Sequence, residues 1–265
     1  MDRLRFTSSQ APNASEVVGA ILEQLSRHLG ISIDFITEGD WQAREAALEA
    51  GSIQLGWICG LPYVIKADSP NPGIRLLAAP VMASARYQNR PIYYSDVVVR
   101  ADSPFDSFEE LRGAAWAYNE PLSHSGYNIT RYHLATIGET GRFFSQARRA
   151  GSHERALKLL LRGRIDAAAL DSTVLETELR ARQDLAGQIR IIATLGPSPI
   201  PPWVIHRSVP EDICQALHSA LTQLHNDDDG RALLAAGALA RFTSVEDSDY
   251  DPIREMARQA EAIQL

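Results

Sequence analysis

Short runs of β-forming residues alternate along this chain with helix-forming stretches, and this alternation constrains the fold more than any other feature. Such alternation is typical of α/β proteins with largely parallel sheets. At 265 residues the chain is also long enough to form two lobes, each with its own core. The predicted strands lie at 4–7, 31–36, 53–58, 74–79, 97–100, 114–118, 167–171, 189–194 and 203–206, and the predicted helices at 16–29, 41–50, 108–112, 127–137, 154–162 and 212–225.

Two segments are expected to connect the lobes. The first lies near residues 93–97, just before a predicted strand, and the second near residues 194–203. The second contains four prolines and is interpreted as a rigid, extended connection. We therefore expect a discontinuous first lobe, formed by residues 1–93 and 203–265, and a second lobe formed by residues 94–202.

Composition and charge exclude several classes of protein. The net charge is −7 and Lys and Arg are dispersed, which argues against a nucleic-acid partner. No apolar run approaches the roughly 20 residues that a membrane span requires. The first residues lack the apolar core of a secretory signal, so either a leader has been removed or the protein stays in the cytoplasm. Cys59 and Cys214 fit no metal or redox spacing, and we expect no cofactor and no metal.

The segment Ser123-His124-Ser125-Gly126 is the strongest candidate for a ligand site. In open α/β sheets, ligands bind beyond the carboxyl ends of the strands, where loops lead into helices. Here a predicted strand ends, Pro121 turns the chain and a helix follows. Either serine can cap that helix, and the glycine lets the backbone approach a ligand. The positive end of the helix dipole then favours an anion. The alternative is an ordinary capped helix start without a ligand.

Four further positions carry weaker signals. His153 begins another predicted helix, and Asp171 ends a predicted strand, where it suits either a ligand or the capping of the next helix. Tyr93 lies at the first expected crossing, and Trp57 ends a strand of the first lobe. Each of these two aromatic residues suits either a ligand cleft or the core.

Seven segments follow one another in a characteristic order along the chain. They are 51–57 (GSIQLGW), 93–99 (YYSDVVV), 102–104 (DSP), 108–113 (FEELRG), 119–126 (NEPLSHSG), 151–154 (GSHE) and 163–171 (GRIDAAALD). Each segment is weak alone, and their common order is fairly specific. In this order they resemble the phosphonate-binding branch of the periplasmic solute-binding proteins of ABC transporters, and the similarity extends from about residue 51 to about residue 203.

The resemblance implies a type II periplasmic-binding-protein fold, in which two α/β lobes joined by two crossings close on a small anionic ligand in the interlobe cleft. It assigns the ligand oxygens to Ser123, His124 and Ser125, with contributions from Tyr93 and His153. It also implies a membrane permease as partner, a periplasmic location and no enzymatic activity. We expect a monomer.

The chain also departs from this family. Binders of aminoalkylphosphonates resemble one another in placing carboxylates around the ligand amine, whereas this chain has Thr173 and the Pro201-Pro202 pair at the matching places. Ile58 replaces an expected aromatic residue, and His124 replaces a smaller hydroxyl residue. The set of residues that would recognise an amine is therefore incomplete, and phosphate, phosphite or another oxyanion is an alternative ligand.

Three alternatives remain open at this point. A hydrolase triad can be drawn from Ser123 or Ser125, His124 or His153, and Asp171, although the sequence lacks a Gly-x-Ser-x-Gly elbow. A metal site formed by His124, His153 and Asp171 is conceivable, but no short ligand spacing supports it. A cytoplasmic sensor of the same fold would signal to a partner protein instead of a permease.

Overall fold

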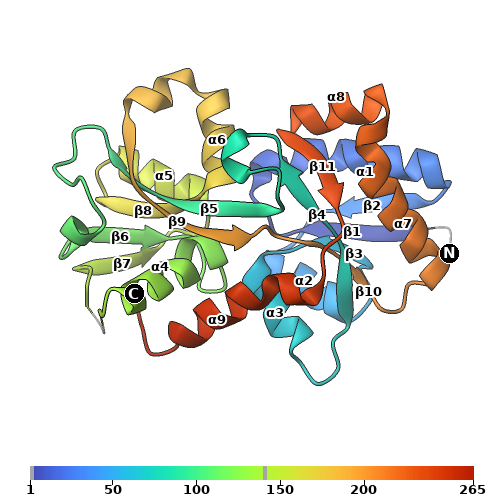
Figure 1. The fold of residues 1–265 in the computed structure, drawn as a ribbon, viewed down its shortest axis with the longest axis horizontal. Coiled ribbons are helices and arrows are strands. Elements are labelled where there is room, and N and C mark those ends of the chain that lie inside the picture. Colours follow the sequence, from blue (N-terminus) through green and yellow to red (C-terminus); the bar gives the residue numbers. More distant parts are fainter. Residues whose placement is uncertain (1–2, 140–141) are drawn as a thin grey trace. The chain divides into compact units, whose positions relative to one another are not determined.

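The computed structural model describes residues 3–139 and 142–265 and shows an α/β protein with two sheets (Figure 1). The chain divides into two compact units. The first comprises Met1–Ile92 and Pro199–Asp251, and the second comprises Tyr93–Ser198 and Pro252–Leu265. Each unit contains one sheet with helices packed on it.

The sheet of the first unit has six strands in the order β11-β4-β10-β3-β1-β2. Strand β1 pairs in parallel with β2 and β3, while β10 runs antiparallel to β3 and β4. The antiparallel β11 closes the edge beside β4. The strands are β1 (Arg3–Ser8), β2 (Ser32–Ile36), β3 (Leu55–Trp57), β4 (Ile74–Met82), β10 (Trp203–His206) and β11 (Leu239–Thr243).

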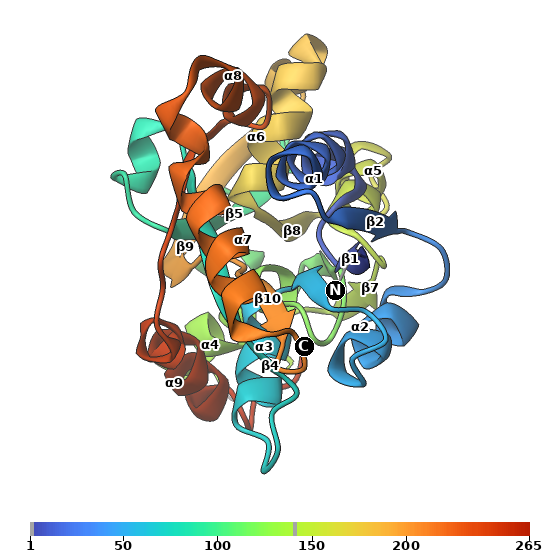
Figure 2. The same cartoon turned by 90° about the vertical axis from the view of Figure 1, so that its right-hand side faces the viewer.

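Five helices pack on this sheet. Helices α1, α7 and α8 lie together, and Figure 2 shows α2 and α3 on the other side of the strands. Helix α1 buries Val18, Ile21, Leu22 and Leu25, which recur at helical spacing and give it one apolar face. The helices are α1 (Ser15–Leu29), α2 (Trp41–Glu49), α3 (Gly60–Ala67), α7 (Glu211–Gln223) and α8 (Asp228–Ala236).

The sheet of the second unit has five strands in the order β7-β6-β8-β5-β9. Strand β6 pairs in parallel with β7 and β8, and β5 is antiparallel to β8. The strands are β5 (Ile92–Arg100), β6 (Ala115–Tyr118), β7 (Gln146–Arg149), β8 (Ala167–Asp171) and β9 (Ile189–Pro199), and the helices are α4 (Ile129–Thr136), α5 (His153–Leu161), α6 (Ser172–Ala181) and α9 (Asp251–Gln259).

Both faces of this second sheet are covered, and this explains the uninterrupted apolar run in β8. Successive side chains of a strand point to opposite faces. Ala167 and Ala169 accordingly pack with α4 in one core cluster, while Ala168 and Leu170 pack with α5 and α6 in another. A strand buried on both faces reads as continuous apolar sequence rather than as an alternation.

The C-terminal segment belongs to the second unit, although the division expected from the sequence places it in the first. Arg131 of α4 donates hydrogen bonds to the carbonyl oxygens of Ile263 (from Nε) and Ala260 (from Nη2), both at 2.6 Å. Ile263 is buried in the core cluster that α4 shares with the sheet. Only contacts formed after folding place this segment, so no local pattern in the sequence reveals them.

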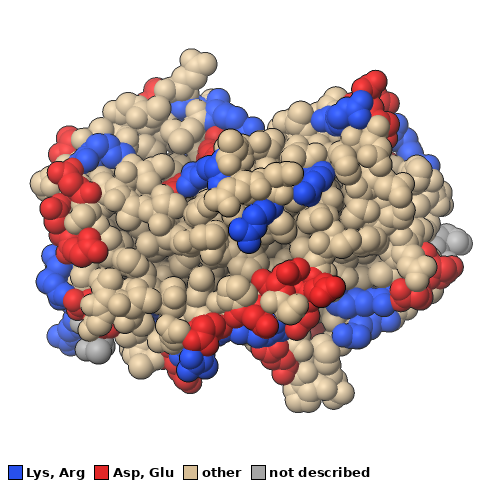
Figure 3. Space-filling model, viewed as in Figure 1, with Lys and Arg blue, Asp and Glu red and all other residues tan. Residues whose placement is uncertain are grey.

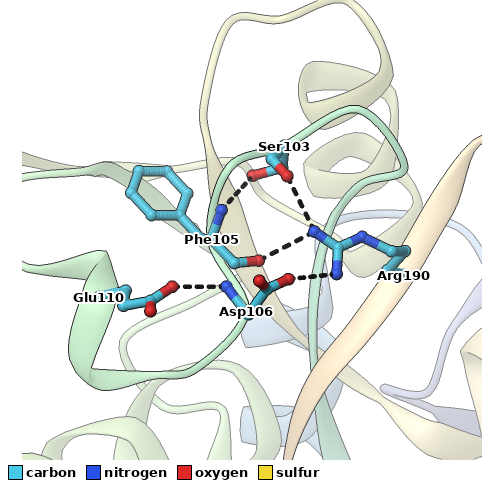
Figure 4. Close-up of polar contacts among 5 residues, drawn as sticks. All are labelled: Ser103, Phe105, Asp106, Glu110 and Arg190. Atoms are coloured by element: carbon cyan, nitrogen blue, oxygen red, sulfur yellow. Dashed lines mark hydrogen bonds and ion pairs between the residues drawn. The ribbon is translucent and has the colours of Figure 1, made fainter.

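A polar network ties one loop of the second unit to its sheet (Figure 4). Arg190 of β9 donates from Nη2 to the carbonyl oxygens of Ser103 and Phe105, at 2.8 and 3.1 Å, and its Nη1 lies 2.7 Å from Asp106 Oδ1. The backbone N–H of Asp106 donates to Glu110 at 2.6 Å. The residues 109–111 that follow form a short 3-10 turn instead of the α-helix predicted over 108–112.

All nine predicted strands are present in the structure, and five of the six predicted helices are confirmed within a few residues. Six elements were not predicted: β7, β11, α3, α6, α8 and α9. Strands β7 and β11 lie at sheet edges. Strand β7 is largely polar, and Arg241 interrupts the short apolar pattern of β11.

On the face shown in Figure 3, Lys and Arg lie in small separate groups among other residues and form no continuous basic area. Within the described part of the chain, the helices are too short or too polar for any of them to span a bilayer.

Candidate functional site

The candidate site lies in the second unit, at the end of the sheet where the carboxyl ends of its parallel strands meet. Strands β6, β7 and β8 run in the same direction, so the loops that follow them emerge side by side. Backbone hydrogen bonds join the first two of these loops, from Ala150 N–H to the Tyr118 oxygen at 2.7 Å and from Gly151 N–H to the Asn119 oxygen at 2.9 Å. The starts of the next two helices are therefore held close together.

Ser123 caps the helix start that was predicted to hold an anion. Its Oγ accepts the backbone N–H of Gly126 at 3.1 Å, which resolves the choice between the two serines in favour of Ser123. The first turn, η4 (His124–Asn128), is π-helical, because the Asn128 N–H bonds to the Ser123 carbonyl oxygen five residues back. Helix α4 follows directly. The Ser125 N–H lies in the first turn, where backbone N–H groups lack an intrahelical acceptor.

Ser125 is in contact with His153, and Asn119 joins the same group. The Nε2 atom of His153 lies 3.1 Å from Ser125 Oγ and 3.1 Å from Asn119 Nδ2. His153 is the first residue of α5, whose cap Ser152 accepts the Arg155 N–H at 3.1 Å. Burial lowers the pKa of His153 to about 4, so its ring is neutral at pH 7.

Gly126 makes room for Asn119. A Cβ atom at position 126 would lie 2.0 Å from Asn119 Oδ1 and 3.2 Å from His153 Cε1. The sequence suggests that this glycine allows a ligand to approach the backbone, and the structure places the Asn119 carboxamide there. Asn119 Oδ1 and His153 Nδ1 are both buried without a hydrogen-bond partner among the described residues.

His124 is fully buried, and neighbouring side chains engage both of its ring nitrogens. Nε2 lies 2.8 Å from Ser198 Oγ at the end of β9, and Nδ1 accepts from Asn128 Nδ2 at 3.2 Å. Burial lowers the pKa of His124 to about 3. The buried ring of Tyr93 lies nearby, with ring centroids 6.4 Å apart. His124 thus links the helix start to the last strand of its own sheet.

Asp171 caps the next helix. Its Oδ1 accepts from Thr173 twice, from the backbone N–H at 2.8 Å and from Oγ1 at 2.7 Å. Burial is the largest cause that raises the pKa of Asp171, from 3.8 to about 6. Of the two roles proposed for this residue, capping is the one that its contacts show.

Trp57 belongs to the first unit. It ends β3, where its Nε1 donates to the Pro201 carbonyl oxygen at 2.9 Å, and its ring packs at 6.3 Å from that of Trp203. The site of the second unit therefore brings together Ser123, Ser125, Gly126 and His153, with His124 and Tyr93 packed behind it and Asp171 at the same sheet edge. Trp57 lies in the first unit, and its contact with a ligand stays a prediction.

The group is polar but uncharged. Asn119, Ser123 and Ser125 carry no charge, and His153 is neutral at pH 7. A hydroxyl group, the N–H of Ser125 and the positive end of a helix suit an anion. Within residues 3–139 and 142–265, no three His, Cys, Asp or Glu side chains gather into a possible metal site.

The Ser125–His153 pair resembles two members of a hydrolase triad, but in the part of the chain that the structure describes the third member, a carboxylate, is missing from it. The Nδ1 atom of His153 has no partner among the described residues, whereas a triad requires a carboxylate there. Asp171, the carboxylate considered from the sequence, is bonded to Thr173 instead. Asn119 also lies at the nitrogen that would have to accept the serine proton.

Sequence reasoning did not select two residues of this region, Asn119 and Ser198. Asn119 directly follows strand β6, and a polar residue at that place was a usable signal. Ser198 lies in the proline-rich stretch, and only the folded structure places it beside His124.

Comparison with known proteins identifies a family for this chain. A family model described as "ABC transporter, phosphonate, periplasmic substrate-binding protein" matches residues 5–250. The match covers most of both units and includes every residue of the candidate site.

Solved structures show the same fold at low sequence identity. A binding-protein component of an ABC phosphonate transporter from Pseudomonas aeruginosa is 17% identical over 98% of this chain and 86% of that chain, with a TM-score of 0.85. PhnD1 from Prochlorococcus marinus, solved in complex with methylphosphonate, is 20% identical over 99% of both chains, with a TM-score of 0.84. The aliphatic sulphonate binding protein SsuA from Escherichia coli is 18% identical over 97% of this chain and 86% of that chain, with a TM-score of 0.63. The predicted type II periplasmic-binding-protein fold is confirmed.

Proposed function

Because the chain belongs to the family of periplasmic phosphonate-binding proteins of ABC transporters, we propose that it binds a small phosphonate-type oxyanion at the helix start of η4. Members of this family are solute-binding proteins and not enzymes. Ser125 would contact the ligand through its hydroxyl and its N–H, and the Ser123 hydroxyl would be a second donor. His153 would act through its contact with the Ser125 hydroxyl. Tyr93, Gly126 and His124 would form the surroundings of the ligand site.

One observation supports this assignment above the others. The Ser125 hydroxyl, the first-turn N–H of Ser125 and the start of a helix coincide at one place, in a group that has no negative charge of its own. An anion there gains hydrogen bonds and a favourable helix dipole without displacing an internal ion pair.

The ligand is proposed to lack an amine. Among the candidate site residues, Asp171 is the one carboxylate, and its Oδ1 is already bonded to Thr173. Burial also raises its pKa, which weakens its role as a fixed negative charge. Methylphosphonate, the ligand of the similar Prochlorococcus protein, is therefore a better first probe than an aminoalkylphosphonate.

Calorimetric titration with a small panel tests the proposal. The panel comprises methylphosphonate, 2-aminoethylphosphonate, phosphite, inorganic phosphate and methanesulphonate. We expect methylphosphonate to bind more tightly than 2-aminoethylphosphonate and to raise the melting temperature. If 2-aminoethylphosphonate bound most tightly, the argument about the amine would be wrong, and if none of the five bound, the anion site would be refuted.

Membership of the family supports a proposal about the partner and the location. We propose that the protein works in the periplasm, as a monomer, and delivers its ligand to the permease of an ABC transporter. Fractionation of cells that express the native gene tests the location. Recovery in the cytoplasm would favour the alternative, a sensor of the same fold.

A further inference from the structure

Two histidines of the second unit each contact one asparagine and one serine, but they do so in different ways. Asn128 and Ser198 engage opposite nitrogens of His124, which links two elements through the ring. Asn119 and Ser125 both meet the same nitrogen of His153, at equal distances of 3.1 Å. This second arrangement restricts where the imidazole proton can be.

The Nε2 atom of a neutral imidazole has either one proton or one lone pair. Asn119 Nδ2 is a donor, so its contact requires the lone pair, and the ring proton must then be on Nδ1. The amide N–H direction is fixed, whereas the Ser125 hydroxyl rotates about its C–O bond. When the amide occupies the lone pair, the hydroxyl proton is free to turn toward another acceptor.

We infer that Asn119 is a positioning residue for the ligand site: it fixes the Nδ1–H tautomer of His153 and thereby leaves the Ser125 hydroxyl proton for the anion. This inference rests on the proposed function and deepens it. Asn119 does not itself need to touch the ligand.

The structure holds Asn119 firmly in this role. Its carbonyl oxygen accepts the Gly151 N–H at 2.9 Å, which joins its backbone to the loop that leads to His153. Its side chain lies against Gly126, where even a Cβ atom would collide with it. The backbone and the side chain of Asn119 are thus both in contact with elements that carry Ser125 and His153.

The ionisable neighbours do not alter the charge of His153. They are Glu154 and Arg155 on α5 itself, Glu120 in the loop after β6, and Arg149 at the end of β7. Glu120 and Arg149 pair with each other at 2.6 Å. Burial alone accounts for the lowered pKa of His153, so the choice at neutral pH is between two uncharged tautomers.

Nitrogen-15 NMR of the unliganded wild-type protein tests the inference without any variant of Asn119. The two tautomers of a neutral imidazole have distinct ring-nitrogen shifts, and the His153 signals are identified by their loss in His153→Gln. We expect the Nδ1–H tautomer for His153 and the opposite, Nε2–H, for His124. A His153 ring with its proton on Nε2 would overturn the inference.

Asn119→Leu provides the functional test, with Asn128→Leu as the matched control. We expect Asn119→Leu to bring an Nε2–H population to His153 and to weaken methylphosphonate binding about ten-fold, the size of one hydrogen bond. Asn128→Leu should change the His124 signals and leave the His153 tautomer as it was. An unchanged His153 spectrum in Asn119→Leu would contradict the role of Asn119.

The two proposals fail in different ways. If wild-type protein binds none of the anions, the proposed function is wrong, but the tautomer of unliganded His153 can still be read. If His153 has its proton on Nε2 while methylphosphonate binds, the site stands and only the role of Asn119 is refuted.

Discussion

The Oγ atom of Ser125 lies 3.1 Å from the Nε2 atom of His153, although the two residues begin different helices. Strands β6 and β7 are parallel neighbours, so the helices that follow them start at the same sheet edge. This single contact joins the two parts of the candidate site. It also places the neutral imidazole of His153 next to the Ser125 hydroxyl, which we expect to bind the ligand.

Removal of the Ser125 hydroxyl should weaken ligand binding and leave the fold intact. A hydrogen bond to a charged group contributes about 1.5–3 kcal/mol, so Ser125→Ala should lower the affinity for methylphosphonate about ten- to a hundred-fold. Calorimetric titration measures this change. The control is Ser145→Ala, because Ser145 is an exposed serine of the same unit. Equal affinities for the two variants would exclude Ser125 from the site.

Substitution of Gly126 should act through Asn119. In Gly126→Ala the new Cβ would meet Asn119 Oδ1 at 2.0 Å, so the carboxamide must move. We expect a loss of stability of about 1–3 kcal/mol, typical of overpacking, together with weaker methylphosphonate binding.

The double variant shows whether Asn119 is the cause. In an Asn119→Ala background the collision is removed, and the same glycine substitution should cost markedly less stability. Denaturant unfolding of the four proteins measures the coupling. Additive effects of the two substitutions would show that Gly126 is required for another reason.

The pH dependence of stability should contain a contribution from Asp171. Its pKa is raised by burial from 3.8 to about 6, so the folded protein binds this proton more tightly than the unfolded chain. The contribution is therefore fully present at pH below 4 and is lost as the pH rises to about 6. Asp171→Asn keeps the acceptor for Thr173 but cannot ionise.

Comparison of the wild type with Asp171→Asn isolates the contribution of Asp171 to the pH dependence of stability. From pH 4 to pH 7, the free energy of unfolding of the wild type should fall relative to Asp171→Asn, by up to about 3 kcal/mol for a shift of two pKa units. Urea unfolding at several pH values measures the difference. Parallel pH profiles would indicate that Asp171 ionises normally in the folded protein.

Arg131 should hold the C-terminal segment to the second unit. Its hydrogen bonds to the carbonyl oxygens of Ile263 and Ala260 are lost in Arg131→Ala, and residues 252–265 should then exchange amide hydrogens at least about ten-fold faster, since each net hydrogen bond is worth about 1 kcal/mol. The control is Arg258→Ala, because Arg258 pairs only with exposed residues of its own helix, among the contacts described. Similar exchange in both variants would mean that Arg131 does not anchor the segment.

The sequence predicted best those features that depend on local patterns. The run 167–170 identified a strand buried on both faces, and the residues around Ser123 identified a capped helix start, because strand burial and helix capping are encoded within a few residues. The edge strand β7 was missed because its charged residues are typical of an exposed edge and not of a core strand.

The roles of single side chains could be predicted less well. His124 and His153 look equivalent in the sequence, since each lies at a helix start. Only the tertiary contacts show that His124 is bonded on both sides by Ser198 and Asn128, while His153 meets Ser125. Partners 28 to 74 residues apart in sequence are brought together by the order of the strands, which no local pattern reveals.

A crystal structure of the protein with methylphosphonate tests the central claim most directly. We predict that a phosphonate oxygen lies within hydrogen-bonding distance of both Oγ and the backbone N of Ser125, at the start of η4. A phosphonate bound elsewhere on the protein, with the Ser125 hydroxyl still directed at His153, would contradict the account.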